Sequence, residues 1–326
     1  MNLQSHPRLL GDIGGTNARF AWQAAADAAP SEVATYACAE HASLRTAIGQ
    51  YLADHHKPRP VACGIGIANP ILGDRVQMTN HHWSFSISEL QREIGAERLA
   101  VVNDFTALAL ALPALGEGDL RPVGAGSALP DAAMALIGPG TGLGASGLLP
   151  VAGGGWAPIT GEGGHVTLAP ADDRESAVLE RLRHRFGHAS AERALSGPGL
   201  VNLYVAACEL ARQAVQPLGP AEVIERARSG SDPCCAAALE LFCIFLGSVA
   251  GNLALTLGAR GGVFIGGGIA PRLLPELERS AFRERFEGKG RFRDYLRAIP
   301  TRVIDAAVSP ALIGASRALD MAAAQV

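Results

Sequence analysis

Residues 11–22 read GDIGGTNARFAW, and this stretch decides the fold. Together with Leu9 and Leu10 it gives two strand-like runs on either side of a turn that contains Gly14 and Gly15, which predicts a β-hairpin. Residues 19–22 alternate and carry aromatic side chains, so a strand follows the glycines and not the helix of a dinucleotide-binding fold. Successive backbone N–H groups in such a turn form a concave nest that binds phosphate oxygens.

Two more glycine turns follow apolar runs farther along the chain. Residues 134–146 read MALIGPGTGLGAS and repeat the strand-turn-strand pattern, and a predicted strand at 262–265 leads into three consecutive glycines. Three such turns predict a nucleotide site. The chain has no G-x-x-x-x-G-K-[ST] motif, which excludes a P-loop NTPase. The G-x-G-x-x-G match at Gly142, Gly144 and Gly147 is not followed by a helix, which excludes a dinucleotide site.

Composition sets the broad class of the protein. The 326 residues predict about two domains, and a hydrophobic content of 48% is enough to give each a core. Charged residues make up only 18% of the chain and the net charge is −3, which argues against a nucleic-acid partner. The 39 glycines exceed the usual share and cluster beside apolar runs, which suggests tight turns where the main chain approaches a ligand closely.

Two features bear on the compartment. Residues 1–8 contain no apolar segment of the kind found in a secretory signal, so we expect a cytoplasmic protein, with its six cysteines reduced and mostly buried. Residues 241–257 are almost wholly apolar and contain Gly247 and Gly251 in G-x-x-x-G spacing. The polar residues of this segment fall on one helical stripe, which favours a buried helix over a membrane span.

The remaining patterns predict a mixed α/β fold with two related halves. Further strands are expected at 61–67 and 99–102, and helices at 43–55, 106–114, 175–187, 199–214, 220–229, 233–258 and 311–324, the last capped by Ser309. A loop rich in glycine and proline at 113–130 is the best domain boundary. The predicted domains are residues 1–114 plus 305–326 and residues 115–304.

Several polar residues have both a functional and an ordinary interpretation. Asp104 lies between a predicted strand and a predicted helix, where it could be a catalytic carboxylate or a helix N-cap. Asn103 beside it could simply form a turn. Gly163 and Gly164 make a helix improbable between Glu162 and His165, so a loop that binds hydroxyl groups is expected there. Taken alone, Glu192 would be a solvated glutamate on a helix face.

The ordered set of motifs resembles the zinc-free type of bacterial glucokinase, within the superfamily of sugar kinases, actin and the Hsp70 ATPase. Besides GDIGGTNARFAW, the motifs are MTNHHWSFS at 78–86, VVNDFTALA at 101–109, LIGPGTGLGAS at 136–146, GEGGH at 161–165, SAERALSGPGL at 190–200, GGVFIGGGIAPRL at 261–273 and FEGKGRF at 286–292. The related ROK proteins carry a cysteine-rich zinc motif after their sugar histidine, whereas His165 is followed by VTLAP. That departure argues against membership of the ROK group and against structural zinc.

The resemblance implies a two-domain actin-like ATPase (ribonuclease H-like) fold with a central cleft, and an ATP-dependent phosphorylation of the glucose 6-hydroxyl that feeds glycolysis. It implies that Asp104 is the catalytic base and that Asp12 holds Mg²⁺ through water. A homodimer is expected, with glucose and MgATP as ligands and neither a nucleic acid nor a membrane as partner. The implied site residues are Asn103, Asp104, Glu162, His165 and Glu192 for the sugar, Gly11, Asp12, Ile13, Gly14, Gly15 and Thr16 for the first phosphate loop, Gly138, Gly140, Thr141 and Gly142 for the second, and Gly266, Gly267 and Gly268 for adenosine.

Some alternatives stay open at this point. We assign the β-phosphate to the first phosphate loop, at 14–15, and the γ-phosphate to the second, at 138–144, but these two assignments could be interchanged. A non-catalytic sugar sensor could share the fold, although the predicted base and both phosphate loops are intact. An ATPase of the Hsp70 or exopolyphosphatase kind would have no use for the predicted sugar residues. The discrimination between glucose, mannose and glucosamine depends on geometry at one carbon of the sugar.

Overall fold

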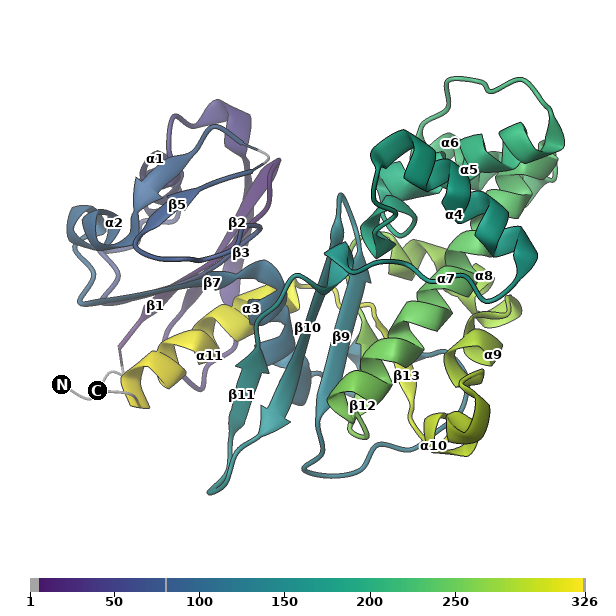
Figure 1. Ribbon diagram of the computed structural model, residues 1–326. Helices are drawn as coiled ribbons and strands as arrows, with labels where there is room; N and C mark the ends of the chain where they lie inside the picture. Colours follow the sequence, from purple (N-terminus) through teal and green to yellow (C-terminus); the bar gives the residue numbers. More distant parts are fainter. Residues whose placement is uncertain (1–5, 80, 325–326) are drawn as a thin grey trace. The chain divides into compact units, whose positions relative to one another are not determined.

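The computed structural model describes residues 6–79 and 81–324 (Figure 1). The chain forms two compact units. Unit 1 is made of Met1–Asp119 with Ala306–Val326, and unit 2 is Leu120–Asp305. The boundaries expected from the sequence, after residues 114 and 304, lie slightly before those of the structure. The two units are described separately below.

Unit 1 contains a five-stranded sheet in the order β3-β2-β1-β4-β7. Strand β2 is antiparallel to both β1 and β3, whereas β1, β4 and β7 are parallel, with Ile13 opposite Ile67 and Ile67 opposite Asn103. The carboxyl ends of these three strands therefore meet at one edge. The strands are β1 Arg8–Ile13, β2 Asn17–Gln23, β3 Ser31–Ala37, β4 Ala62–Ile67 and β7 Arg98–Asn103, and a separate ribbon is formed by β5 Arg75–Gln77 and β6 Ser84–Ser86.

Helices cover both faces of this sheet because its strands alternate. Leu9 of β1 belongs to the main core of unit 1 together with Tyr51 of α1, whereas Leu10 packs with Leu312 of α11 on the other face. Figure 1 shows α11 running beside α3 in unit 1. The helices are α1 Leu44–Asp54, α2 Ile87–Ile94, α3 Asp104–Ala111 and α11 Pro310–Ala324.

Glycines allow main-chain contact on the face that carries α3 and α11. A Cβ atom on Gly66 of β4 would lie 2.9 Å from the Cβ of Ala107 in α3. A Cβ on Gly314 of α11 would collide with the carbonyl group of Ala107, and one on Gly64 would collide with that of Ala315. Glycine is thus required at these three positions because the two helices and β4 lie in backbone contact.

Unit 2 repeats the topology of unit 1. Its sheet has the order β11-β10-β9-β12-β13-β8, in which β9, β10 and β11 are antiparallel and β9, β12 and β13 are parallel. The first five strands thus match the order of unit 1, with β8 added antiparallel to β13. The prediction of two related α/β halves is confirmed. The strands are β8 Leu120–Pro122, β9 Met134–Pro139, β10 Leu143–Pro150, β11 Trp156–Ile159, β12 Gly262–Ile265 and β13 Thr301–Ile304.

The helices of unit 2 form its core against this sheet, and the long ones begin and end within a few residues of the predicted bounds. They are α4 Asp173–Phe186, α5 Gly197–Ala211, α6 Pro220–Ser229, α7 Pro233–Leu257, α8 Leu274–Arg279, α9 Phe282–Glu287 and α10 Arg293–Arg297. Short 3-10 turns complete the chain at Cys38–Glu40, Leu112–Ala114, Glu117–Asp119, Gly163–His165, Ala191–Arg193, Ala270–Leu273 and Gly290–Phe292.

Helix α7 is the apolar segment noted in the sequence. It is long and apolar enough to cross a membrane, yet 78% of its most apolar stretch is buried inside the protein. Cβ atoms on Gly247 and Gly251 would collide with the carbonyl groups of Phe282 and Phe286 in α9. The G-x-x-x-G spacing therefore brings α9 close to α7, and the prediction of a buried core helix is confirmed.

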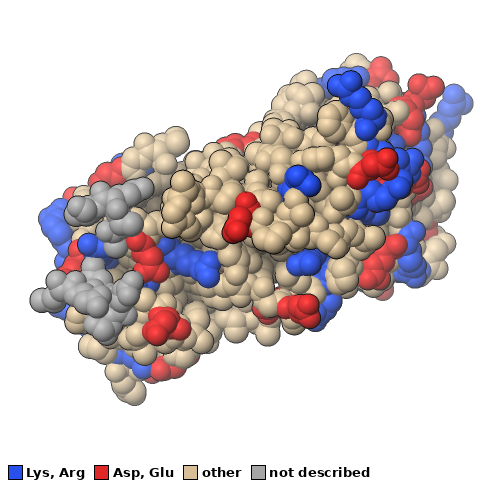
Figure 2. Space-filling view, turned by 90° about the horizontal axis from the view of Figure 1, so that it is seen from below, with Lys and Arg blue, Asp and Glu red and all other residues tan. Residues whose placement is uncertain are grey.

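The cysteines and surface charges also follow the sequence-based expectations. All six cysteines are buried, and none of them forms a disulfide. On the face shown in Figure 2, acidic and basic side chains are interspersed among uncharged ones, as expected for a net charge of −3.

The close packing of α11 on α3 predicts an unusual result for a glycine-to-alanine change. Gly314→Ala should lower the free energy of unfolding by about 1–3 kcal/mol, because the added methyl group displaces α11 from α3. Helix propensity alone would give the opposite sign, a gain of about 1 kcal/mol. Urea unfolding of the full chain measures the difference.

The matched control is Gly49→Ala in α1, where nothing lies within 4 Å of the added Cβ. This variant should gain up to about 1 kcal/mol. Stabilisation of both variants to the same extent would contradict backbone contact between α3 and α11.

Candidate active site

The first group of predicted site residues gathers at the carboxyl edge of the unit 1 sheet. Asp12 is the next-to-last residue of β1, Asn103 is the last residue of β7, and Asp104 is the first residue of α3. Asn103 is the N-cap of α3, since its Oδ1 accepts the N–H groups of Phe105 at 2.9 Å and Thr106 at 3.2 Å. The alternative that Asp104 caps this helix is therefore wrong, because its neighbour does so.

Asp104 is held by one oxygen and free at the other. Its Oδ1 accepts the N–H of Phe105 at 2.9 Å and the amide of Asn103 at 3.0 Å. Its Oδ2 makes no hydrogen bond within residues 6–79 and 81–324. Burial raises the pKa of Asp104 to about 6, and the nearby negative charge of Asp12 adds to this effect, whereas the hydrogen bonds oppose it. The result is a carboxylate that is more basic than an exposed Asp but still ionised at neutral pH.

Both polar groups of the Asn103 side chain form hydrogen bonds with other residues of unit 1. Its carbonyl oxygen caps α3, and its amide donates to Asp104 and, at 3.5 Å, to the carbonyl oxygen of Asn69. It therefore orients the Asp104 carboxylate. The sugar contact expected of Asn103 stays a prediction.

Asp12 is also held through one oxygen. Its Oδ2 accepts the Ser309 hydroxyl at 2.7 Å and the Arg19 guanidinium at 3.2 Å, and its side chain is 14% exposed. Sequence reasoning missed both partners. Arg19 lies directly opposite Asp12 in the β1–β2 register, so the hairpin could have revealed that pair. Ser309 was expected to cap α11, but its hydroxyl donates to Asp12 from the far end of the chain.

The first glycine turn joins β1 to β2. Gly14 donates its N–H to the carbonyl oxygen of Asn17 at 2.9 Å, and the carbonyl oxygen of Thr16 accepts the N–H of Cys38 at 2.8 Å. The N–H groups of Gly15 and Thr16 have no acceptor among the residues that the structure describes, and Thr16 is exposed. Such free amides are what an anion-binding turn requires.

The second and third glycine turns lie against each other in unit 2. The second turn was predicted as a phosphate loop, and we call it the phosphate hairpin. It comprises residues 138–142, from the end of β9 to the start of β10, and Gly140 donates its N–H to the carbonyl oxygen of Gly142 at 2.8 Å. Gly267 has φ of +79°, and a Cβ there would collide with Pro139. Ile269 donates to the carbonyl oxygen of the same proline at 3.3 Å. The Gly266–Gly268 turn is therefore adjacent to the phosphate hairpin.

Glu162 directly precedes the 3-10 turn Gly163–His165 and His165 is its last residue, where the sequence predicted a loop. A Cβ on the buried Gly164 would collide with the carbonyl group of Leu143, so the turn lies on β10 directly after the phosphate hairpin. Both side chains are exposed and make no hydrogen bond or ion pair within the described part of the chain. Positions three apart fall on one side of a 3-10 turn, which suits joint binding of one ligand.

Glu192 lies in the 3-10 turn Ala191–Arg193, and its Oε2 accepts the N–H of Leu143 at 2.9 Å. The alternative of a solvated glutamate on a helix face is wrong. Unit 2 thus brings Glu192 to the phosphate hairpin, beside the turn of Glu162 and His165. No signal in the sequence predicted this contact.

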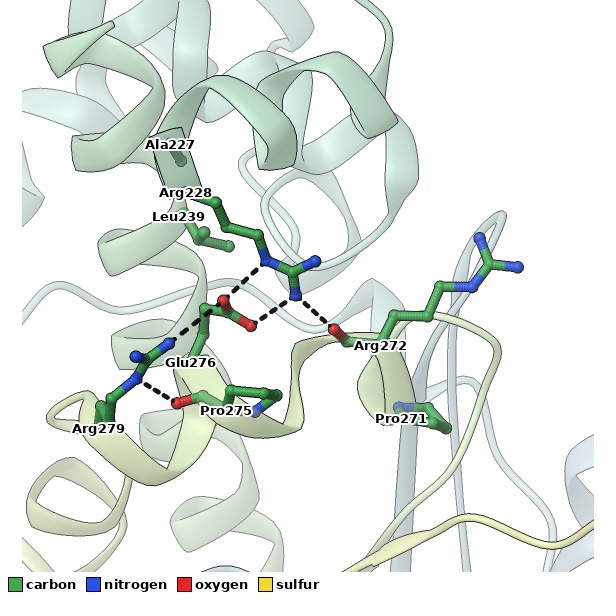
Figure 3. Close-up of a pocket in the computed structure, with 8 residues that line it drawn as sticks. All are labelled: Ala227, Arg228, Leu239, Pro271, Arg272, Pro275, Glu276 and Arg279. Atoms are coloured by element: carbon green, nitrogen blue, oxygen red, sulfur yellow. Dashed lines mark hydrogen bonds and ion pairs between the residues drawn. The ribbon is translucent and has the colours of Figure 1, made fainter. Parts of the chain in front are cut away.

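A cavity of about 700 Å³ lies in unit 2 beside the 3-10 turn that follows the triple glycine (Figure 3). Its apolar wall includes Ala227, Pro271 and Pro275. Arg228 donates two hydrogen bonds to Glu276, both at 2.9 Å, and a third to the carbonyl oxygen of Arg272 at 2.6 Å. The hydrogen bonds with Arg228 lower the pKa of Glu276, so the pair is ionised. This cavity was not predicted from the sequence.

Comparisons with known proteins identify the family of this chain. The family model described as Glucokinase matches residues 9–322. A glucokinase of Aromatoleum aromaticum is 54% identical over 321 residues, which cover 98% of this chain and 96% of that protein. The crystal structure of a glucokinase from an Antarctic psychrotroph has a TM-score of 0.89 at 38% identity, covering 97% of this chain and 99% of that one.

A more distant structure, a ROK family glucokinase from Streptomyces griseus in complex with glucose and AMPPNP, has a TM-score of 0.64 at 18% identity and covers 97% of this chain and 99% of that one. At that identity the similarity concerns the fold alone. The full-length match to the family model and the 54% identical relative decide the assignment. This chain belongs to the glucokinase family.

Proposed function

We propose that the protein transfers the γ-phosphoryl group of ATP to the 6-hydroxyl of glucose, with Asp104 as the catalytic base. The observation that carries the proposal is the Asp104 carboxylate, which is anchored through Oδ1, free at Oδ2, and has a pKa of about 6. In phosphoryl transfer to an alcohol the protein does little covalent work, so alignment of the hydroxyl and removal of its proton are its main tasks. Oδ2 accepts that proton as the new O–P bond forms.

The sugar is proposed to be bound by Asn103, Glu162, His165 and Glu192. Glu162 and His165 support this because they are exposed and have no partner of their own in the described residues. A site built from such acceptors and donors selects a ligand whose hydroxyl groups satisfy each of them, because any group left unpaired on binding costs free energy. Glucose has enough hydroxyls to do so.

The nucleotide is proposed to bind at the three glycine turns. The free N–H groups of Gly15 and Thr16 suit phosphate oxygens, and the Gly266–Gly268 turn lies next to the phosphate hairpin. Asp12 fits an indirect magnesium contact, because its Oδ1 is unpartnered in the described residues while Ser309 and Arg19 occupy Oδ2. Mg²⁺ bound with ATP would neutralise phosphate charge during transfer.

The cavity of Figure 3 is proposed to take the adenine base. It borders the 3-10 turn that directly follows Gly266–Gly268, the predicted adenosine turn. Flat proline surfaces and an arginine held by Glu276 suit an aromatic ring, which stacks on apolar atoms and on guanidinium planes. Only a few residues separate the glycine turn from the residues that line the cavity. A nucleotide with its phosphates at the turn can therefore place its ribose next to the turn and its adenine in the cavity.

Loss of the base should remove the activity but not sugar binding. Asp104→Ala is expected to reduce kcat by about 100-fold or more, while the Kd for glucose stays within a few-fold of the parent value. A coupled assay of glucose-dependent ADP release measures kcat, and calorimetry measures Kd. In the parent protein, kcat/KM should fall about tenfold for each pH unit below 6 and level off above 7, because the carboxylate must be ionised.

Three outcomes would contradict the proposal. An Asp104→Ala variant that keeps a tenth of kcat would remove Asp104 from the base role. Absence of ADP release from the parent at millimolar glucose and MgATP would favour a sugar sensor. ADP release without sugar would favour an ATPase of the Hsp70 kind.

The raised pKa also predicts an effect on stability. The folded pKa of Asp104, about 6, exceeds the value of about 3.9 for an unfolded chain, so the native state binds more protons between these two values. The contribution of Asp104 to stability therefore falls as pH rises through this window. Asp104→Asn should be more stable than the parent by on the order of 2 kcal/mol at pH 8, with the gap closing toward pH 4. Urea unfolding at the two pH values tests this, and a gap independent of pH would argue against the raised pKa.

Filling the cavity should weaken nucleotide binding selectively. Ala227→Phe is expected to raise the KM for ATP about tenfold or more while the KM for glucose stays unchanged, since the bulky ring occupies the space that adenine needs. Glu225→Phe, on an exposed position of the same helix, is the control and should change neither constant. An equal change in the KM for ATP in both variants would show that the cavity does not hold adenine.

A further inference from the structure

We infer that Glu192 is a positioning residue for the phosphate hairpin as well as a sugar ligand, and that it couples sugar binding to nucleotide binding. This inference rests on the proposed function, which assigns the hairpin to ATP and Glu192 to glucose. The contact that supports it is the bond from the Leu143 N–H to Glu192 Oε2 at 2.9 Å. Leu143 is the first residue of β10, where the hairpin ends.

The segment around Glu192 holds the hairpin at two points. Gly197 donates its N–H to the carbonyl oxygen of Gly140 at 2.8 Å, which fastens the tip of the turn to the start of α5. Glu192 fastens the other flank through its side chain. The segment is itself rigid, because Ser196 donates its hydroxyl to the backbone oxygen of Glu192 and accepts the N–H of Gly199, both at 2.9 Å. Only the second fastening depends on the side chain of Glu192.

Gly142 gives independent support for a built-in contact. A Cβ at this position would lie 2.5 Å from Glu192 Oε2. Gly142 does not have a positive φ, so the turn itself does not demand glycine there. The space that the missing side chain leaves is occupied by the carboxylate. A methyl group at position 142 would therefore displace the Glu192 carboxylate from the Leu143 N–H.

The second oxygen of the carboxylate gives the coupling. Oε1 of Glu192 makes no hydrogen bond within residues 6–79 and 81–324, so it is available to a sugar hydroxyl while Oε2 holds the hairpin. A sugar that fixes the side chain through Oε1 also fixes the hairpin amide through Oε2. Because binding free energies are reciprocal, glucose and nucleotide must then raise each other's affinity by the same factor.

The test measures the Kd of Mg·AMPPNP by calorimetry, with and without saturating glucose. The parent should bind the nucleotide analogue about fivefold or more tightly when glucose is present. Glu192→Ala should bind it several-fold more weakly without glucose and should lose the coupling. Glu192→Gln keeps an acceptor for the Leu143 N–H, so it should restore the affinity for nucleotide measured without glucose.

Glu162→Ala is the matched control, because Glu162 belongs to the same proposed sugar set but its side chain makes no hydrogen bond or ion pair with the hairpin. It should lose glucose affinity and leave the Kd of Mg·AMPPNP without glucose unchanged. As a single substitution, Gly142→Ala should weaken nucleotide binding. Added to Glu192→Ala, it should have little further effect, because the carboxylate that the new methyl group would contact is gone. Thermal unfolding of each variant checks that it is folded.

Unchanged Mg·AMPPNP affinity in folded Glu192→Ala would overturn the inference and leave Glu192 as a sugar ligand at most. Additive effects of Gly142→Ala and Glu192→Ala on the Kd of Mg·AMPPNP would overturn it too, because the two residues would then act independently. Failure of the proposed function looks different. In that case no ADP would form from MgATP when glucose is added, although the Kd of Mg·AMPPNP for Glu192→Ala could still be compared with that of the parent.

Discussion

In unit 1 the carbonyl group of Ala107 occupies the space where a Cβ on Gly314 would be, and this contact between α3 and α11 determines where the proposed base lies. Asp104 begins α3, so its position depends on how closely α3 approaches β4 and α11. Glycine at 64, 66 and 314 allows that approach at main-chain distance. A helix positioned by backbone contact holds its first residue more rigidly than one resting on flexible side chains, and phosphoryl transfer requires such rigidity.

The same packing sets the chemistry of the carboxylate. Burial raises the pKa of Asp104, and the charge of Asp12 raises it further. The hydrogen bonds from Asn103 and Phe105 counteract this and keep the group ionisable near neutral pH. A more exposed Asp would be a weaker base, and a fully unpartnered buried one would stay protonated. The N-cap of α3 thus contributes to both the orientation and the protonation state of the proposed base.

Much of the fold could be predicted from the sequence because its signals are local. Glycine turns between apolar runs revealed the two hairpins, and periodicity revealed α6 at its observed bounds, Pro220–Ser229. The sequence left a cap role for Asp104 open because Asn103 and Asp104 are both good N-caps, and only coordinates show which one has helical geometry. The 3-10 turn at Gly163–His165 was missed because two glycines favour an irregular loop, and contact with β10 overrides that preference.

The site itself depends on contacts between residues that are far apart in the sequence. Ser309 reaches Asp12 and Glu192 reaches Leu143, and neither pair has a spacing that could reveal it. The repeated topology explains instead where Asp104 and the Gly266–Gly268 turn lie, since they directly follow the parallel strands β7 and β12. In both sheets an antiparallel glycine hairpin leads into parallel strands, so segments that follow those strands converge on the hairpin edge. Asp12 takes the next-to-last position of β1, and Gly138 takes the equivalent position of β9. The two similar backbones thereby differ in charge at one position. In the proposed assignment the carboxylate that would contact the metal lies in unit 1, and the hairpin proposed for phosphate in unit 2 has no strand carboxylate at the equivalent position to repel it.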